Sequence, residues 1–439
     1  MILLIFLPKS YIIKVGKDEL SKGVPMAEII KRIIRKQNTE GEKDMIIYSK
    51  NIICEQGIID GYLVVEGSII KDIVRKEVEE LEADLDYSEE IIIPGIFDTH
   101  NHGFMGYDPE DVEEGESAVE GYLKALASVA VTSIFPTVTD ENGAFKQVVA
   151  VAKKEPVGAK ILGIHSEGPY LNRVGEKGVD TGHPDIDLNF VQKMIDDGEG
   201  YLKLVALAPE LPLAKEAIRL LTKNGVRVAF AHSNQTYEEA MESFKQGISV
   251  TTHTANVMAG IHHRNMGGLG ACLLNDEIYN ELICDGLHVR NEMIEMMLRI
   301  KKDALHKFMM ISDNVHLGGL KPGRYNNGPF GPVNITEEGF CLTDTGRLAG
   351  SAKPVLYGMK NLVCNMGKRL EDVCIMASLN PAQVYGFGDH KGSLAVCKDA
   401  DFAVIDKDFN CLYTYSEGRK IYDHTIDTDL ENPKAAKYR

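Results

Sequence analysis

The sequence predicts an α/β protein built as a (β/α)8 TIM-like barrel, with a small β-sandwich formed by both ends of the chain. Three observations lead to this prediction. Apolar β-branched runs alternate with helical stretches through the middle, and short strand patterns with Gly and Asp turns occur near both ends. The length of 439 residues is also sufficient for two structural units. Strands buried on both faces read as continuous apolar runs, as the middle runs do.

The first 44 residues differ from the remainder of the chain. They contain more basic than acidic side chains, although the whole chain has a net charge of −17. Isoleucines between Ile29 and Ile34 form a stripe at helical spacing. The stripe indicates a membrane-surface helix, a helix packed on the body, or an extension that is not part of the native protein, and we favour the last two. Met45 then begins a clean strand pattern.

Residues 45–94 and 391–425 are predicted to form the small β-sandwich. MIIYSKNIIC and YLVVEGSIIKDIV are strand patterns separated by a turn with Gly57 and Gly61, and KGSLAVCKDADFAVIDKD repeats this character near the other end. Residues 95–390 are left as a separate barrel.

Eight apolar runs in this middle region are the predicted barrel strands, and each ends in polar residues. In chain order they are IIIPGIFDTHNHG, VTSIFPTVT, KILGIHSEG, LKLVALAPE, VRVAFAHS, SVTTHTAN, YNELICDGLH and KFMMISDN. The catalytic groups of such barrels lie at the C-terminal ends of the strands. We therefore expect the polar residues to converge on one mouth, although they are far apart in the sequence.

Histidines and carboxylates occupy these strand ends. They are His100 and His102 on the first strand, Glu167 on the third, His232 on the fifth, His253 on the sixth and Asp313 on the eighth. Two histidines separated by one intervening residue on a strand point to the same face, as two ligands of one metal must. A single histidine is more often a core or surface residue, but this many at strand ends favour a divalent metal, zinc or iron, with one or two ions per subunit.

Asp313 permits two interpretations. It follows the apolar run FMMIS, so it could cap the next helix, or it could be the base that takes a proton from an attacking water. We favour the base because of its position on the last strand.

Charge and composition argue against several classes of protein. The acidic net charge argues against nucleic acid as a partner, and no apolar run reaches the roughly 18 residues of a membrane span. The opening MILLIFLP lacks the flanks of a signal peptide. The eight cysteines form no CxxC pair, which is typical of reduced thiols. We expect a cytoplasmic protein.

The motifs resemble those of the amidohydrolase superfamily and, within it, the N-acetylglucosamine-6-phosphate deacetylase family. Matching segments run in family order over nearly all of the chain after Met45. They include PGIFDTHNHG, GIHSEGPYLN, AHSNQTYEEA, THTANVMAGIHHR, CDGLHV and RLAGSA. EGP after the third strand and DGLH after the seventh are the most specific, whereas His-X-His alone indicates only the superfamily.

The resemblance implies a role for each matching residue. Glu167, His232 and His253 match the principal metal ligands, and His100 and His102 match a pair with which some members hold a second metal. Asp313 matches the general acid/base, His288 the contact to the N-acetyl carbonyl, and Asn256 and Arg264 the sugar-phosphate segment. The implied reaction is hydrolysis of the N-acetyl group of N-acetylglucosamine 6-phosphate in amino-sugar catabolism, by a homodimer.

Departures from the family pattern leave the exact sugar open. The family's Glu-Pro-Gly after Arg264 is Asn265-Met266-Gly267 here, and Ala255 replaces an aromatic residue. N-acetylgalactosamine 6-phosphate or another small amide is therefore an alternative substrate. A non-enzymatic scaffold is disfavoured because no predicted ligand or base is lost.

Overall fold

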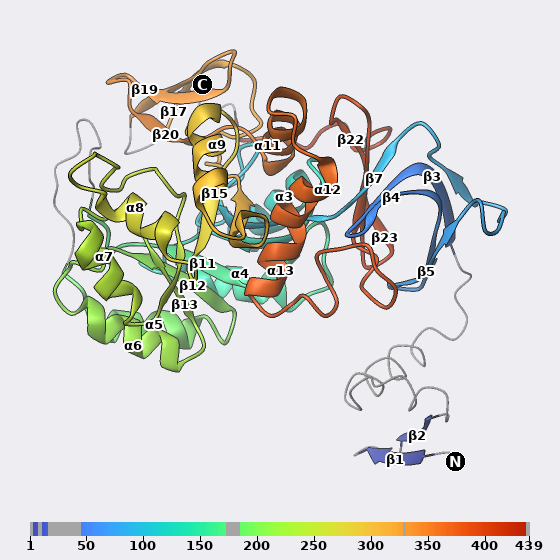
Figure 1. Ribbon diagram of the computed structural model, residues 1–439, viewed down its shortest axis with the longest axis horizontal. Coiled ribbons are helices and arrows are strands. Elements are labelled where there is room, and N and C mark those ends of the chain that lie inside the picture. Colours follow the sequence, from blue (N-terminus) through green and yellow to red (C-terminus); the bar gives the residue numbers. More distant parts are fainter. Residues whose placement is uncertain (1–2, 8–10, 16–44, 173–184, 328–330, 436–439) are drawn as a thin grey trace.

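The computed structural model describes residues 3–7, 11–15, 45–172, 185–327 and 331–435. In Figure 1 the parallel strands and the helices around them form one part of the molecule, and a mostly antiparallel sheet lies beside that part. Near the N-terminus, β1 (Leu3–Leu7) and β2 (Tyr11–Val15) pair antiparallel. The isoleucine stripe predicted between Ile29 and Ile34 lies outside the described residues.

All eight predicted barrel runs contain parallel strands. One sheet has the order β11 (Ile164–Glu167), β12 (Leu202–Leu207), β13 (Arg227–Phe230), β14 (Ile248–Thr251), β15 (Tyr279–Ile283) and β16 (Phe308–Ile311). The other contains β8 (Ile96–Asn101), β9 (Val131–Pro136) and the short β10 (Lys160–Ile161).

The two parallel sheets meet at both edges. The Val138 N–H donates to the His165 carbonyl at 3.0 Å, which joins the end of β9 to β11. The Asp313 N–H donates to the His100 carbonyl at 2.9 Å, which joins the end of β16 to β8. The parallel strands therefore form one curled sheet that fits a barrel.

Helices follow the parallel strands along the chain. They are α3 (Glu116–Ala127), α4 (Ala144–Ala152), α5 (Leu188–Asp197), α6 (Ala214–Lys223), α7 (Tyr237–Phe244), α8 (Gly267–Leu274), α9 (Asn291–Ile300), α10 (Ala304–Lys307), α11 (Val355–Lys360), α12 (Leu370–Cys374) and α13 (Asn380–Val384), with π-helical turns η2 (Asn361–Asn365) and η3 (Ile375–Leu379). In α6, Ala217, Ile218 and Leu221 recur at helical spacing and are buried against the strands. The main core thus lies between the curled sheet and its helices.

Strands from both chain ends pair in another, mostly antiparallel sheet. Its order is β23 (Arg419–Asp423), β22 (Cys411–Ser416), β21 (Phe402–Ile405), β7 (Ile91–Pro94), β3 (Met45–Cys54), β4 (Gly57–Glu66) and β5 (Ile69–Arg75), with β6 (Leu85–Asp86) also paired to β3. The ends join where Ala403 pairs with Ile93 between β21 and β7. Hydrogen bonds make this one continuous sheet, with Ile47, Leu63 and Phe402 in a shared buried cluster.

A separate four-stranded sheet was not predicted from the sequence. It comprises β17 (Gly323–Asn326), β18 (Pro332–Ile335), β19 (Phe340–Thr343) and β20 (Leu348–Ser351), all antiparallel, within the range taken as barrel alone. Its last residue, Ser351, donates its N–H to the Asp313 carbonyl at 2.9 Å. The sheet is therefore anchored beside the end of β16 and lies along one edge of the molecule in Figure 1.

The state of the cysteines and the character of the helices bear on two predictions from the sequence. All eight cysteines are free thiols, and most are buried. Within the part of the chain that the structure describes, no helix combines the length and apolar character needed to cross a membrane.

Candidate active site and metal centre

The predicted site residues lie where the parallel strands open into loops. His100 is within β8 and Glu167 ends β11, whereas His232, His253 and Asp313 each lie two residues beyond their strands. These last three adopt positive φ angles of 41°, 28° and 51°. The left-handed region costs a residue with a side chain about 1–2 kcal/mol, so the surrounding fold holds them there. Such strain is typical of functional positions.

The first group of potential metal ligands contains His232, His253 and Glu167. The two Nε2 atoms lie 3.0 Å apart. Glu167 Oε1 lies 2.8 Å from Nε2 of His253 and 3.2 Å from Nε2 of His232. Both imidazoles are buried. Three donor atoms from three strand ends therefore converge on one point.

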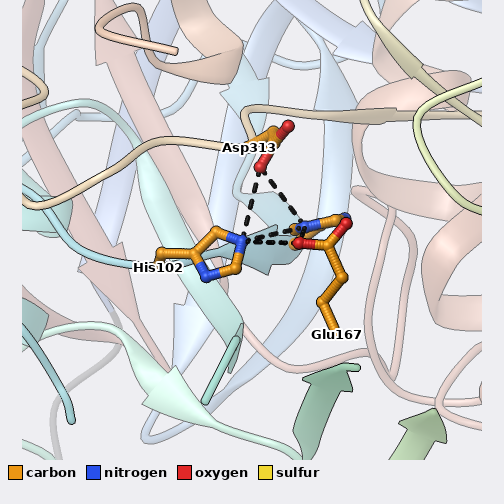
Figure 2. Close-up of side chains that lie close together, drawn as sticks. His102, Glu167 and Asp313 are labelled. Carbon is orange, nitrogen blue, oxygen red and sulfur yellow. Dashed lines mark hydrogen bonds and ion pairs between the residues drawn. The ribbon is translucent and has the colours of Figure 1, made fainter. Parts of the chain in front are cut away.

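The second group contains His100, His102 and Asp313, again with Glu167. The Nε2 atoms of the two histidines lie 3.2 Å apart, and Asp313 Oδ1 lies 3.3 and 3.4 Å from them. Glu167 Oε2 is 3.2 Å from Nε2 of His102 and 3.6 Å from Nε2 of His100. Figure 2 shows His102 facing both carboxylates. Glu167 thus offers one oxygen to each group.

These donor sets fit divalent metal ions. Within each group the potential ligand atoms all lie within 4.8 Å of one another. Four ligands placed tetrahedrally at the ~2.0–2.1 Å typical of zinc–nitrogen bonds are about 3.3 Å apart. The separations described above are close to this value. Lone pairs of facing imidazoles repel unless a cation or a proton lies between them, so the geometry suits a metal ion in each group.

The carboxylates of the cluster are held in the ionised form. Burial acts to raise the pKa of Glu167, but the charge and hydrogen bonds of the facing histidines outweigh it and lower that pKa well below its usual value. The pKa of Asp313 is also lowered, because His100 and His102 outweigh the effect of burial. For His102, burial is outweighed by Asp313 and Glu167, which raise its pKa to about 9. Both carboxylates are therefore available to bind a cation or accept a proton.

His288 is oriented by a neighbouring carboxylate. Its Nδ1 lies 2.8 Å from Asp285 Oδ2, while Asp285 Oδ1 accepts the N–H groups of Leu287 and His288. The buried Nε2 of His288 has no hydrogen-bond partner among residues 45–172, 185–327 and 331–435. The contact with Asp285 thus fixes the orientation of the His288 ring.

The two residues predicted to bind the sugar phosphate differ in their placement. Asn256 lies next to the first group, since its Nδ2 donates to the His253 carbonyl at 3.2 Å. Arg264 is exposed on the loop that follows. In the described part of the chain its side chain makes no hydrogen bond or ion pair with the clustered ligands. The structure thus brings Asn256 to the cluster but not Arg264.

Two supporting carboxylates were not identified from the sequence. Glu281 lies inside the apolar run YNELICDG on β15, and its Oε2 is 3.3 Å from His100 Nδ1. Glu210 follows β12 and accepts hydrogen bonds from Asn172, Ser233 and Asn234. An isolated acid within or just after a buried strand was the available signal in both cases.

The amidohydrolase family profile matches residues 91–426. The chain belongs to the amidohydrolase family. The N-acetylglucosamine-6-phosphate deacetylase of Vibrio furnissii is 32% identical to this amidohydrolase over 341 residues, covering 76% of this chain and 83% of that relative. The deacetylase of the same name from Bacillus subtilis is 29% identical over 391 residues, covering 86% and 95%. The N-acetylgalactosamine-6-phosphate deacetylase of Escherichia coli O157:H7 is 28% identical and covers 85% and 98%.

A solved structure of a protein with the same name as the first two of these relatives has a similar fold. The crystal structure of N-acetylglucosamine-6-phosphate deacetylase from Pasteurella multocida aligns with a TM-score of 0.76 and 27% identity, covering 86% of this amidohydrolase and 99% of that chain. Together with the Vibrio relative, this places the amidohydrolase in the N-acetylglucosamine-6-phosphate deacetylase family. The family predicted from the sequence motifs is confirmed.

Proposed function

We propose that this amidohydrolase hydrolyses the N-acetyl group of N-acetylglucosamine 6-phosphate to give glucosamine 6-phosphate and acetate. One observation carries the proposal: two sets of metal-ligand side chains share Glu167 at one mouth of the parallel strands, and Asp313 faces the same cluster. Relatives named for this reaction span most of the chain.

Two divalent ions, zinc or iron, would be held by the cluster. His232, His253 and Glu167 would bind one, and His100 and His102 with the other oxygen of Glu167 would bind the second. A bound divalent ion lowers the pKa of water towards neutrality and polarises a carbonyl group.

Asp313 would act as the acid and base of the reaction. As an ionised carboxylate it takes a proton from the water that attacks the acetyl carbon, and it returns the proton to the departing amine. The new C–O bond forms first and gives a tetrahedral adduct, and the C–N bond breaks when the proton is returned to the nitrogen. Nε2 of His288, the ring nitrogen that does not face Asp285, would donate a hydrogen bond to the carbonyl oxygen, where negative charge develops. Asp285 holds the ring for that contact.

Asn256 and Arg264 would bind the sugar and its phosphate. The acetamide is on carbon 2 of the sugar and the phosphate on carbon 6, so phosphate recognition is expected away from the cluster. The exposed position of Arg264, off the cluster on the loop after His253, agrees with such a role. Its guanidinium can bind phosphate oxygens with two donors.

A second candidate substrate is N-acetylgalactosamine 6-phosphate, which differs only in the configuration at carbon 4. The similarity to the E. coli relative of that name supports it. The changed residues Asn265 and Met266 follow Arg264 directly and could alter this part of the pocket.

Acetate release from a substrate panel tests the proposal. We expect N-acetylglucosamine 6-phosphate to have the highest kcat/KM, above the galactosamine analogue and unphosphorylated N-acetylglucosamine. Arg264→Ala should lower kcat/KM at least ~10-fold for the phosphorylated sugar only, because a charge-assisted hydrogen bond contributes ~1.5–3 kcal/mol. Arg299→Ala, on the exposed side of α9, is the matched control and should change neither. A wild-type enzyme that prefers the unphosphorylated sugar would contradict the assignment.

We also propose how the strands of the two structural units are arranged. We infer that residues 95–390 form a closed eight-stranded barrel, because hydrogen bonds join its sheets at both edges. We also infer that residues 45–94 and 391–425 curl over their shared apolar cluster as a small sandwich. Residues 1–44 as an extension, the homodimer and the cytoplasmic location remain predictions.

A further inference from the structure

Glu281 is a buried carboxylate that faces the imidazole of His100. It lies on β15 and its side chain is 0% exposed. Among the residues that the structure describes, no lysine or arginine forms an ion pair with it. An ionised carboxylate buried in this way is costly unless polar groups compensate for the lost water. Its contacts therefore indicate why the position carries an acid.

Two groups from β8 contact Glu281. Thr99 Oγ1 donates to Oε1 at 3.3 Å, and His100 Nδ1 lies 3.3 Å from Oε2. His100 is also 0% exposed. The opposite ring nitrogen, Nε2, is the one that faces His102, Asp313 and Glu167. The His100 ring thus connects Glu281 to the metal-ligand cluster.

This contact determines which nitrogen of His100 carries the proton. A carboxylate has only acceptor sites, so the Nδ1 facing Glu281 must be the protonated nitrogen. In the neutral ring the lone pair is then on Nε2, directed into the cluster. A carboxylate in this position also makes the ring a stronger ligand and fixes its orientation.

We propose that Glu281 is a positioning residue, which holds His100 in the tautomer and orientation that bind the second metal ion. The inference rests on the proposed function, since it assumes that the cluster binds divalent metal. It assigns Glu281 to the ion held by His100 and His102. The ion held by His232 and His253 should not depend on it, because Glu281 contacts neither of those rings in the described residues.

Zinc binding by the purified full chain tests the proposal. Metal-free protein is dialysed against graded free Zn²⁺, and bound zinc is counted per chain. His102→Ala defines which binding step belongs to the second ion. Glu281→Leu should weaken that same step about 10–100-fold and leave the other unchanged. Glu281→Gln keeps the size and can still accept from Nδ1, so it should recover most of the affinity lost in Glu281→Leu.

Thr99→Val is the matched control. It removes the hydrogen bond to the other oxygen of Glu281 but leaves the contact with His100, so both binding steps should stay near wild type. Equal weakening of both steps in Glu281→Leu, or a loss in Thr99→Val as large as in Glu281→Leu, would overturn the inference. If Glu281→Leu does not fold, Glu281→Gln decides the question: it should weaken only the second step, by a few-fold, and unchanged binding would refute the role.

The two proposals fail in different ways. If wild-type protein binds no zinc, the proposed function fails and Glu281 has nothing to position. If wild type binds two ions and both Glu281 variants bind them equally well, only the inference about Glu281 fails.

Discussion

At Asp313 the fold places a carboxylate beside two imidazoles in a left-handed backbone conformation. We expect Asp313→Asn to retain bound zinc but lose about 10²–10⁴-fold in kcat, because the amide has similar size and cannot accept the proton. Zinc content and steady-state acetate release measure the two effects separately. Asp276→Asn on the surface is the control. Turnover within a few-fold of wild type would remove Asp313 from the role of base.

Glu167 is the residue on which both ligand groups depend. Glu167→Gln replaces one of its two anionic oxygens by an amide nitrogen, which is not a metal ligand. We therefore expect it to weaken both zinc-binding steps and to abolish acetate release, whereas His102→Ala should weaken only one step. Zinc counting on the same preparations provides the comparison. Retention of both ions by Glu167→Gln would show that this carboxylate does not bridge the groups.

The residues facing the cluster could be predicted from the sequence, but those behind them could not. His100, His102 and Asp313 were recognisable because each follows a buried apolar run at a strand end. Glu281 occurs within such a run, where the period of a strand does not show which side chain it meets. Its partner, His100, is on another strand of the curled sheet, so the contact depends on how the strands are arranged in space.

At the scale of elements, Glu210 ties together the loops that carry the ligands. It follows β12 and accepts hydrogen bonds from Asn172 after β11 and from Ser233 and Asn234 after β13, and Ser233 is next to His232. We expect Glu210→Ala to destabilise the protein by about 1–3 kcal/mol, since charged hydrogen bonds are lost from a half-buried site. It should also weaken the zinc step that involves His232. Urea unfolding and zinc titration measure both, with exposed Glu216→Ala on α6 as control; stability and binding equal to that control would contradict this role.

The strands differed in how readily the sequence predicted them. The strands of the curled parallel sheet are mostly apolar runs, because both faces are buried. The strands β17–β20 have only four residues each, and GRYN, PVNI and LAGS contain Gly, Pro or Asn with little apolar character. Their stability comes from packing in a small separate cluster around Tyr325, Val333 and Cys341, which depends on tertiary contacts. The order of strands in the sheet from the two chain ends was likewise beyond the local pattern.

At the scale of the whole molecule, a buried ion cluster connects the parallel-strand unit to the sheet built from the chain ends. Lys391 is 3% exposed and lies 3.1 Å from Asp399, 2.6 Å from Asp401 and 3.4 Å from Glu417, which also pairs with Lys160 of β10. Lys391→Met would remove the cation that these buried carboxylates share, at a cost of about 3–5 kcal/mol. The exposed Lys50→Met is the control and should change stability little, because its ion pair is solvated. Equal urea midpoints for the two variants would show that the cluster does not stabilise this junction.

We propose that the cluster around Glu167 makes this amidohydrolase a metal-dependent deacetylase of N-acetylglucosamine 6-phosphate. The most direct test is acetate release from that sugar by one preparation before metal removal, after removal with a chelator, and after Zn²⁺ or Fe²⁺ is returned. We expect activity in the first state, loss of nearly all turnover in the second, and recovery in the third as bound metal approaches two ions per chain. Undiminished acetate release by the metal-free protein, or no release by the fully loaded protein, would contradict it.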